Sequence, residues 1–237
     1  MIPAALGAAP WQATLPAVAR AEIHRIEYFV VENAKSARAE LKRLDHPIPL
    51  QQLRIAEMPR DMDIAACRHL LEAAAPADRT GVLSEAGCPG VADPGALLAR
   101  AAHEMGWQVR PLVGPSSILL ALMASGLDGQ HFAFHGYLPV DEGARRHKLL
   151  ELEAQSRRER RTQLFIETPY RNRKMFDALI AACAPDSLLC VAADLTMASE
   201  FVRTQTIAAW RKSDAPDLDK RPAIFALLAQ ARSRTAR

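Results

Sequence analysis

Residues 83–95, LSEAGCPGVADPG, decide the fold class of this chain of 237 residues. The apolar run at 81–84 that leads into this stretch predicts a buried strand, and the apolar spacing at 94–105 predicts the helix that follows. The three glycines of the stretch permit positive φ angles or a close approach of the backbone to a ligand. Asp93 is placed to cap the helix, with Pro94 as its first residue. A buried strand that turns into a helix through such a loop is typical of an α/β protein.

The rest of the chain repeats this alternation. Buried strands are expected at residues 26–31, 50–55, 81–84, 109–113, 132–134, 163–167, 188–193, 201–206 and 223–228. Helices are expected between most of them, at residues 36–44, 61–74, 94–105, 116–125, 143–155, 169–183 and 207–211. Strands that alternate with helices indicate a parallel sheet, whereas the short turn between the strands at 188–193 and 201–206 indicates an antiparallel section. We therefore expect a first sheet that is mostly parallel and a second that is mixed.

The chain is expected to form two α/β domains. The charge balance and the strand pattern both change near residues 112–115. This change predicts an N-terminal domain over residues 1–112 and a C-terminal domain with the mixed sheet over residues 113–237.

The composition is that of a globular protein, with 49% hydrophobic and 24% charged residues. No apolar run approaches the roughly 20 residues of a membrane-spanning helix, and residues 1–10 lack the pattern of a secretory signal. We therefore expect a cytoplasmic protein that has no membrane partner. The four cysteines form no CxxC pair and have no histidine at ligand spacing, which argues against a metal site and against a disulfide framework.

The net charge of +3 is unevenly spread along the chain. Residues 142–174 contain 10 lysines and arginines against 5 acidic residues. A solvated helix end explains such a run, and so does a partner rich in phosphate. The composition leaves both explanations open.

Ligands of open α/β sheets bind beyond the carboxyl ends of the strands, so the strand-to-helix turns are the informative places. A second turn, PLVGPSSI at 111–118, presents Ser116 and Ser117 at the start of an apolar helix, and a third turn, FIETPYR, spans 165–171. In the third turn Thr168 is the expected N-cap and Pro169 the first helical residue. Each turn is equally explained as a tight connection. The dinucleotide fingerprint GxGxxG, the phosphate-binding loop and the GxSxG elbow do not occur.

Blocks of residues along nearly the whole chain, in the right order, resemble the small-ribosomal-subunit methyltransferase I family of the tetrapyrrole-methylase superfamily. These blocks are IPAALG at 2–7, ENAK at 32–35 with Arg38, SEAGCP at 84–89, DPG at 93–95, GPSS at 114–117, GYLP at 136–139 and IETPYR at 166–171. The loop with Gly87, Pro89 and the DPG triplet is the most specific of them.

The resemblance implies a homodimer of two-domain subunits that binds S-adenosylmethionine in the cleft between the domains and methylates a ribose 2′-oxygen of ribosomal RNA in the small subunit. By position, the implied cofactor-binding residues are Leu6, Gly7, Ser84, Glu85, Ala86, Gly87, Cys88, Ser116, Ser117, Ile166, Pro222 and Ala223. The implied substrate-binding residues are Asn33, Arg38 and Tyr137, together with Lys35 and Arg171.

Methyl transfer from a sulfonium to a hydroxyl needs alignment of the reacting atoms and a base for the hydroxyl proton. Glu167 and Glu85 are the candidate bases, and Lys35 or Arg171 would hold a phosphate or the developing alkoxide. A surface carboxylate is the alternative interpretation of Glu85. The alternative for Glu167 and Arg171 is a weak ion pair between residues four apart at a helix start.

The chain departs from the family pattern at several positions. The family usually has Asp at the position of Glu85 and Thr at that of Cys88, and Glu-Asp-Thr where this chain has Glu32, Asn33 and Ala34. The C-terminal part is shorter than in typical members. Because Met1 falls almost inside the first loop, we expect the first sheet to lack most of its initial strand. Two alternatives stay open: a methyltransferase of the superfamily that acts on a tetrapyrrole, another small molecule or a protein, and a cofactor-binding assembly protein without activity.

Overall fold

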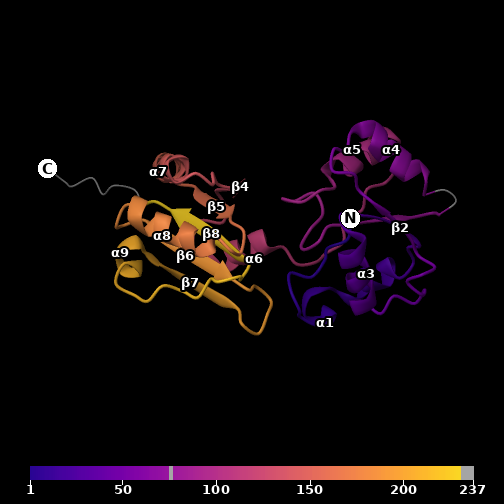
Figure 1. Ribbon diagram of the computed structural model, residues 1–237, viewed down its shortest axis with the longest axis horizontal. Helices are drawn as coiled ribbons and strands as arrows, with labels where there is room; N and C mark the ends of the chain where they lie inside the picture. Colours follow the sequence, from indigo (N-terminus) through magenta and orange to yellow (C-terminus); the bar gives the residue numbers. More distant parts are fainter. Residues whose placement is uncertain (75–76, 231–237) are drawn as a thin grey trace. The chain divides into compact units, whose positions relative to one another are not determined.

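The computed structural model describes residues 1–74 and 77–230 and divides the chain into two compact units, Met1–Ser116 and Ser117–Arg237. The division lies four residues after the boundary expected from the sequence, at the start of an apolar helix. Each unit has a sheet of its own (Figure 1). Two apolar clusters lie within unit 1 and one within unit 2.

Unit 1 is built on a parallel sheet of three strands in the order β2-β1-β3. These strands are β1 (Tyr28–Val31), β2 (Arg54–Glu57) and β3 (Thr80–Leu83). All four residues of β1 are buried, as expected for the central strand of a sheet that is covered on both faces. The helices α3 (Ala34–Arg43) and α4 (Ile64–Glu72) carry the chain from one parallel strand to the next. The expected parallel first sheet is confirmed.

Two apolar clusters cover the two faces of this sheet (Figure 1). On one face, side chains of α2 (Ala17–Ile23) and α3 pack on Phe29 and Val31. On the other face, α4 and α5 (Ala96–Glu104) pack on Tyr28 and Val30. The alternate side chains of β1 therefore serve two cores, as its pleat requires. The short helices α1 (Trp11–Thr14) and α2, which follow Pro10 and Pro16, were not predicted from the sequence.

The strand expected at residues 109–113 is not formed. This segment is extended and hydrogen-bonds to Met1, whose carbonyl accepts from the Leu112 amide over 3.0 Å and whose amino group donates to the Arg110 carbonyl over 2.9 Å. Ile2 in turn makes one isolated bridge to Leu83. The strand prediction was wrong because a strand needs a partner, and the neighbour here is a single residue. Residues 2 and 4 contribute only two isolated bridges to this part of unit 1, Ile2 to Leu83 and Ala4 to Gly87.

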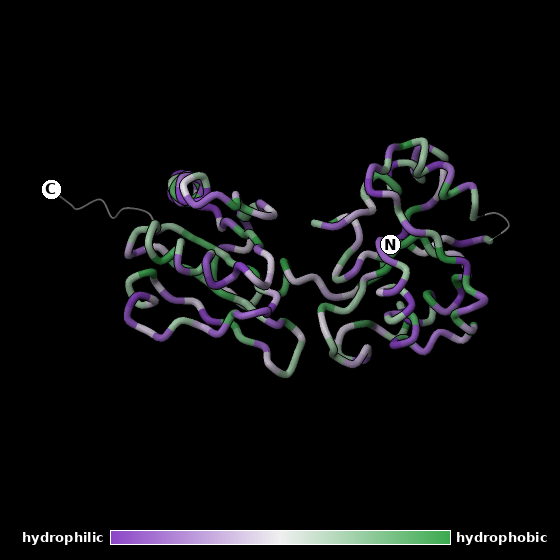
Figure 2. Tube along the Cα trace, in the orientation of Figure 1, coloured by the Kyte–Doolittle hydropathy of each residue, from purple (hydrophilic) through white to green (hydrophobic). Residues whose placement is uncertain are grey.

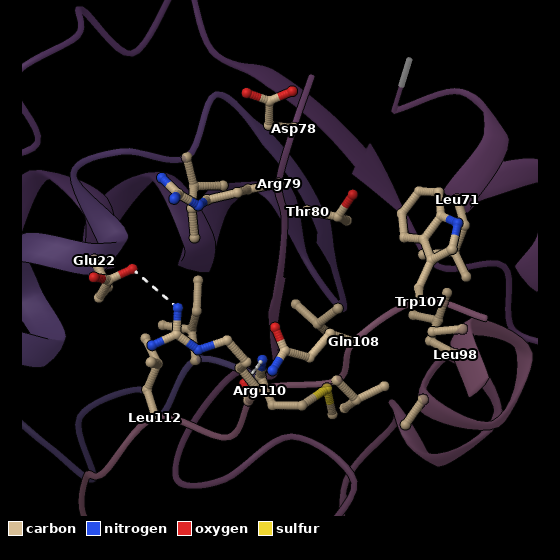
Figure 3. Close-up of a pocket in the computed structure, with 17 residues that line it drawn as sticks. Glu22, Leu71, Asp78, Arg79, Thr80, Leu98, Trp107, Gln108, Arg110 and Leu112 are labelled. Atoms are coloured by element: carbon tan, nitrogen blue, oxygen red, sulfur yellow. Dashed lines mark hydrogen bonds and ion pairs between the residues drawn. The ribbon is translucent and has the colours of Figure 1, made fainter. Parts of the chain in front are cut away.

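A cavity of about 360 Å³ lies beside β3, next to these two short pairings (Figure 3). An ion pair between Glu22 and Arg110, with 3.5 Å between Oε2 and Nη1, lies at its wall. None of the residues that the sequence assigned to a site lines this cavity.

Unit 2 contains a mixed sheet of five strands in the order β4-β5-β8-β6-β7. The strands are β4 (Phe132–Tyr137), β5 (Thr162–Ile166), β6 (Leu188–Ala193), β7 (Phe201–Thr206) and β8 (Ala223–Leu228). β4 and β5 are parallel, whereas β8 pairs antiparallel with β5 and β6, and β6 antiparallel with β7. The expected mixed second sheet is confirmed, including the antiparallel hairpin of β6 and β7.

One core of unit 2 lies between the sheet and three helices, α7 (Glu142–Glu159), α8 (Asn172–Ala182) and α9 (Ile207–Trp210). Phe225 and Leu227 of β8 point into this core, and the fourth helix, α6 (Ser117–Ser125), packs against β6, β7 and β8. Figure 2 shows apolar residues along the strands and mostly polar residues on α7, which matches this layering.

Two expected helix starts are wrong. α5 begins at Ala96 with Gly95 as N-cap at φ 132°, because the Pro94 carbonyl accepts from the Gly90 amide and closes a turn before the helix. α8 begins at Asn172 with Arg171 at the N-cap, because the Thr168 carbonyl accepts from the Arg171 amide. Asp93 and Thr168 therefore cap no helix.

Candidate active site

The carboxyl ends of the parallel strands of unit 1 bring the expected loop residues to one edge of the sheet. The Glu85 amide donates to Oε2 of Glu32 over 3.0 Å, so the loop after β3 is tied to the end of β1. Oε1 of Glu85 accepts from the Ser36 hydroxyl over 3.3 Å, and Ser84 is buried with its hydroxyl donating to the Ala86 carbonyl. This is the edge at which ligands of open α/β sheets bind.

A cavity of about 570 Å³ opens at this edge. It is lined by Glu32, Asn33, Met58, Pro59, Arg60, Met62, Glu85, Asp93, Pro94, Gly95, Ala96 and Leu97. Burial, which has the largest effect, acts together with the negative charges of Glu32 and Glu85 and against a hydrogen bond with Ser84, and the net result raises the pKa of Asp93 from 3.8 to about 6. Three carboxylates that repel one another in a concave site favour a cationic ligand.

The first residues of the chain lie against the same loop. Ala4 and Gly87 exchange two backbone hydrogen bonds of 2.8 and 3.1 Å. A Cβ atom on Gly87, whose φ is 68°, would lie 3.5 Å from Cδ2 of Leu6. The Cys88 thiol donates to the Pro115 carbonyl over 3.4 Å. Within unit 1 the structure thus brings the loop of Leu6 and Gly7, the loop of Gly87 and Cys88, and the segment that leads to Ser116 side by side.

The substrate-binding residues expected on α3 have different roles in the structure. Oδ1 of Asn33 accepts from the amides of Lys35 and Ser36, at 2.9 and 3.0 Å, so Asn33 is the N-cap of α3. Lys35 and Arg38 lie exposed on the helix surface.

The carboxyl end of β5 and its neighbours form the corresponding edge of unit 2. Ile166 pairs with Tyr137 on one side and with Ile224 on the other, and Ala223 pairs with Ala193 of β6. One edge of the sheet therefore carries residues that the sequence assigned separately, namely Tyr137, Ile166 and the start of β8 at Pro222 and Ala223. Tyr137 is 60% exposed.

Glu167 and Arg171 form an ion pair at this edge. Oε1 of Glu167 accepts from Nε and Nη2 of Arg171 at 3.0 and 2.7 Å and from the Thr168 amide at 2.6 Å. The Glu167 side chain is 1% exposed and that of Arg171 is 32% exposed. The pair is thus buried on its acidic side, and three donors on one oxygen fix the orientation of the carboxylate. Glu167 belongs to unit 2 and Glu85 to unit 1.

Sequence reasoning missed a polar cluster beside this pair. Asp194, buried at the end of β6, accepts from Nε of Arg221 over 2.7 Å and from the Ser199 hydroxyl over 2.8 Å. Nδ2 of the fully buried Asn172 donates to the Arg221 carbonyl over 2.6 Å. These contacts join the residue before Pro222 to the start of α8. Asp194 and Arg221 are 27 positions apart, so no local sequence pattern predicts that they form a pair.

Six of the ten basic residues at 142–174 form ion pairs with neighbouring acids. Lys148 pairs with Glu151, Arg158 and Arg161 with Glu159, Arg157 with Asp186, Arg171 with Glu167, and Arg173 with Asp177. Arg145 is buried and donates to a backbone carbonyl. These ion pairs reduce the support that the basic run gave to a phosphate-rich partner, but Arg146, Arg160 and Lys174 form no ion pair among the described residues.

The described part of the chain contains no group of three or more acidic, histidine and cysteine residues that could hold a metal ion. Its four cysteines are free thiols. None of its helices combines the length and the apolar character of a membrane span.

Residues 13–210 match the family described as Tetrapyrrole (Corrin/Porphyrin) Methylases. Among curated proteins, the chain is 36% identical over 149 residues to the ribosomal RNA small subunit methyltransferase I of Xylella fastidiosa, an alignment that covers 63% of this chain and 53% of the relative. It is 34% identical over 127 residues to the protein of the same name from Vibrio cholerae, covering 54% and 43%. The aligned part of the chain spans about half the length of the curated relatives it matches.

Solved structures share the fold. A diphthine synthase superposes with a TM-score of 0.63 at 16% identity, over 95% of this chain and 88% of that one. The methyltransferase CobJ superposes with a TM-score of 0.59 at 19% identity, over 94% and 91%. At such identities the likeness concerns the fold alone. The extent of the family match is what assigns the chain, which belongs to the tetrapyrrole (corrin/porphyrin) methylases.

Proposed function

We propose that this protein is a methyltransferase that uses S-adenosylmethionine and transfers its methyl group to a ribose 2′-oxygen of ribosomal RNA. Membership of the methylase family supports the class of reaction. The curated relatives named for the ribosomal RNA of the small subunit support the substrate, and the ribose oxygen follows from the motif resemblance.

The acidic cavity of unit 1 is the observation that carries the proposal. S-adenosylmethionine bears a sulfonium and an ammonium group, and Glu32, Glu85 and Asp93 give the cavity the opposite charge. The volume of about 570 Å³ lies in the range of small-molecule sites. Gly87, in the loop next to the cavity, has a φ of 68°, and a glycine in this conformation allows close approach of the backbone to a ligand.

Residues of the chain are candidates for removing the hydroxyl proton and for binding the substrate. When bound, the cofactor supplies a methyl group that is already activated for displacement. Glu85 is the better candidate for the base that takes the hydroxyl proton, because the only hydrogen bond found on its carboxylate in the described structure comes from Ser36 over 3.3 Å. Glu167, with three donors on one oxygen, instead holds Arg171 in position. Arg171 is then the candidate to bind a phosphate of the substrate.

Other parts of the expectation stay predictions. They are the homodimer, the cytoplasmic location, the small ribosomal subunit as partner, and the assignment of the unit 2 residues Ser117, Ile166, Pro222 and Ala223 to the cofactor. The assignments of Lys35 and Arg38 to substrate and of Leu6, Gly7 and Ser116 to cofactor are likewise proposals.

Calorimetric titration with S-adenosylhomocysteine tests the cofactor site. We expect micromolar affinity, lost in Ser116→Trp and kept in Ala154→Trp, which places the same bulk on the exposed surface of α7. Mass-spectrometric mapping of ribose methylation in ribosomal RNA from a knockout tests the substrate. Loss of one 2′-O-methyl group is the expected result, and an unchanged map from a strain that lacks the protein would contradict the proposal.

A further inference from the structure

The exposed surface of α3 carries three cations in a line. Lys35, Arg38 and Lys42 are all exposed, and at 100° per residue they fall within about 60° of one another around the helix axis. Ala37 and Leu41 point the opposite way, into the core. We call Lys35, Arg38 and Lys42 the α3 stripe.

The carboxylates around the α3 stripe are engaged elsewhere. At the amino end of the helix, Glu57 accepts from the Ala34 amide and Glu85 from the Ser36 hydroxyl. Along the helix, Glu40 pairs with Arg43, and beyond its end Asp45 pairs with Arg20. Among the described residues, no carboxylate lies within ion-pair distance of the three stripe cations, in contrast to the paired cations of α7.

We propose that the α3 stripe binds the phosphate backbone of a single-stranded RNA segment of the substrate. Lys35 and Lys42 are seven residues apart, so the stripe is about 10 Å long and can contact neighbouring phosphates of one strand. The stripe starts next to Asn33, which lines the acidic cavity. That the polyanion is RNA rests on the proposed function, whereas the charge pattern of α3 is independent of that proposal.

The surface fits RNA better than it fits an anionic membrane. Amphipathic helices that lie on membranes insert large apolar side chains. The exposed face of α3 has only Ala39 besides its three cations. A narrow line of flexible point charges suits a row of phosphates, and the nearby carboxylates of the cavity keep those phosphates on the stripe and out of the cofactor site.

The test is fluorescence anisotropy of a labelled oligouridylate of about 12 nucleotides, measured with the full chain between about 50 and 200 mM salt. Each phosphate contact adds about 0.7 to the slope of log affinity against log salt concentration. Arg38→Gln/Lys42→Gln should therefore lower that slope by about 1.4 and weaken binding on the order of tenfold at about 0.15 M salt. Arg68→Gln/Arg100→Gln removes the same charge from unit 1, but from cations that pair with Glu104, and should bind like the wild type.

Titration of both variants with S-adenosylhomocysteine separates this proposal from the proposed function. Unchanged affinity for that ligand, together with weaker RNA binding in the stripe variant alone, is the expected result. Equal RNA binding by the two variants would overturn the stripe, as would a defect in binding vesicles with anionic lipid that leaves RNA binding intact. A wild-type chain that binds RNA through the stripe but does not bind S-adenosylhomocysteine would count against the methyltransferase proposal only.

Discussion

Arg171 donates from both Nε and Nη2 to a single oxygen, Oε1 of Glu167, across 3.0 and 2.7 Å. The Glu167 side chain is almost fully buried, so water has little access to replace this partner. Arg171→Ala should therefore lower the free energy of unfolding by about 1–3 kcal/mol, since it leaves a buried charged acceptor without its strongest donors. Urea denaturation measures the change.

The matched control is Arg173→Ala, two positions along the chain. Arg173 pairs with Asp177, but both side chains are more than half exposed, so its loss should cost less than about 0.5 kcal/mol. Equal losses in the two variants would show that Glu167 is hydrated in solution and that the pair does not hold the end of β5.

Asn33 has a structural role that can be separated from any role in substrate binding. Its side chain caps α3 through the amides of Lys35 and Ser36. Asn33→Ala should lower stability by about 0.5–2 kcal/mol, whereas Asn33→Asp, which caps as well, should keep it. Thermal unfolding of the two variants checks this. A loss of RNA methylation in Asn33→Asp at unchanged stability would assign Asn33 a contact with substrate; full activity in that variant would leave it a cap only.

The raised pKa of Asp93 predicts how stability depends on pH. Its pKa is about 6 in the folded protein against an ordinary value of 3.8, so between these values the folded state holds the proton more tightly than the unfolded chain. The contribution of Asp93 to stability is therefore most favourable below about pH 4, falls as the pH rises toward 6 and is level above that. Asp93→Asn cannot ionise and should escape this fall.

The measurement is the free energy of unfolding of both proteins between about pH 4 and pH 7. The advantage of Asp93→Asn should grow over this range, reaching on the order of 1 kcal/mol after allowance for the partial exposure of the side chain. A difference that stays constant with pH would mean that neither burial nor the neighbouring carboxylates raise the pKa of Asp93 in the folded protein.

Most strands of the two sheets could be predicted because their apolar runs are local and continuous, although the strand expected at 50–55 forms at Arg54–Glu57. β6, β7 and β8 occupy the expected residues, and the short turn between β6 and β7 correctly predicts their antiparallel pairing. The segment at 109–113 has the same composition but no strand partner besides Met1. Pairing is a tertiary property, so its absence could not be read from the segment itself.

Helix starts and charge clusters depended on contacts between distant residues. Pro94 looked like a first helical residue, but its carbonyl bonds to Gly90 and delays α5. Glu32 and Asp93 are 61 positions apart, and only the fold brings their charges close enough to raise the pKa of Asp93. The sequence placed Glu85 in the site, yet the acidic character of the cavity around it required the structure.

Gly114, near the end of unit 1, lies against Pro3 near its start, and this contact leaves no room for a side chain at position 114. A Cβ atom at this position would lie 2.4 Å from Cβ and 2.6 Å from Cγ of Pro3, and neither atom of a proline ring can turn away. Because Pro3 lies between the backbone bonds of Ile2 and Ala4 to β3 and to Gly87, the clash cannot be relieved without breaking them. Gly114→Ala should therefore lower the free energy of unfolding by about 1–3 kcal/mol and weaken S-adenosylhomocysteine binding.

Gly129→Ala, whose Cβ would meet nothing closer than Leu122 at 4.0 Å, should leave stability unchanged or raise it by up to about 1 kcal/mol. If Gly114→Ala were as stable as the wild type, the first residues of the chain would not lie against this loop, and the cluster of Leu6, Gly87 and Cys88 would lose its physical basis.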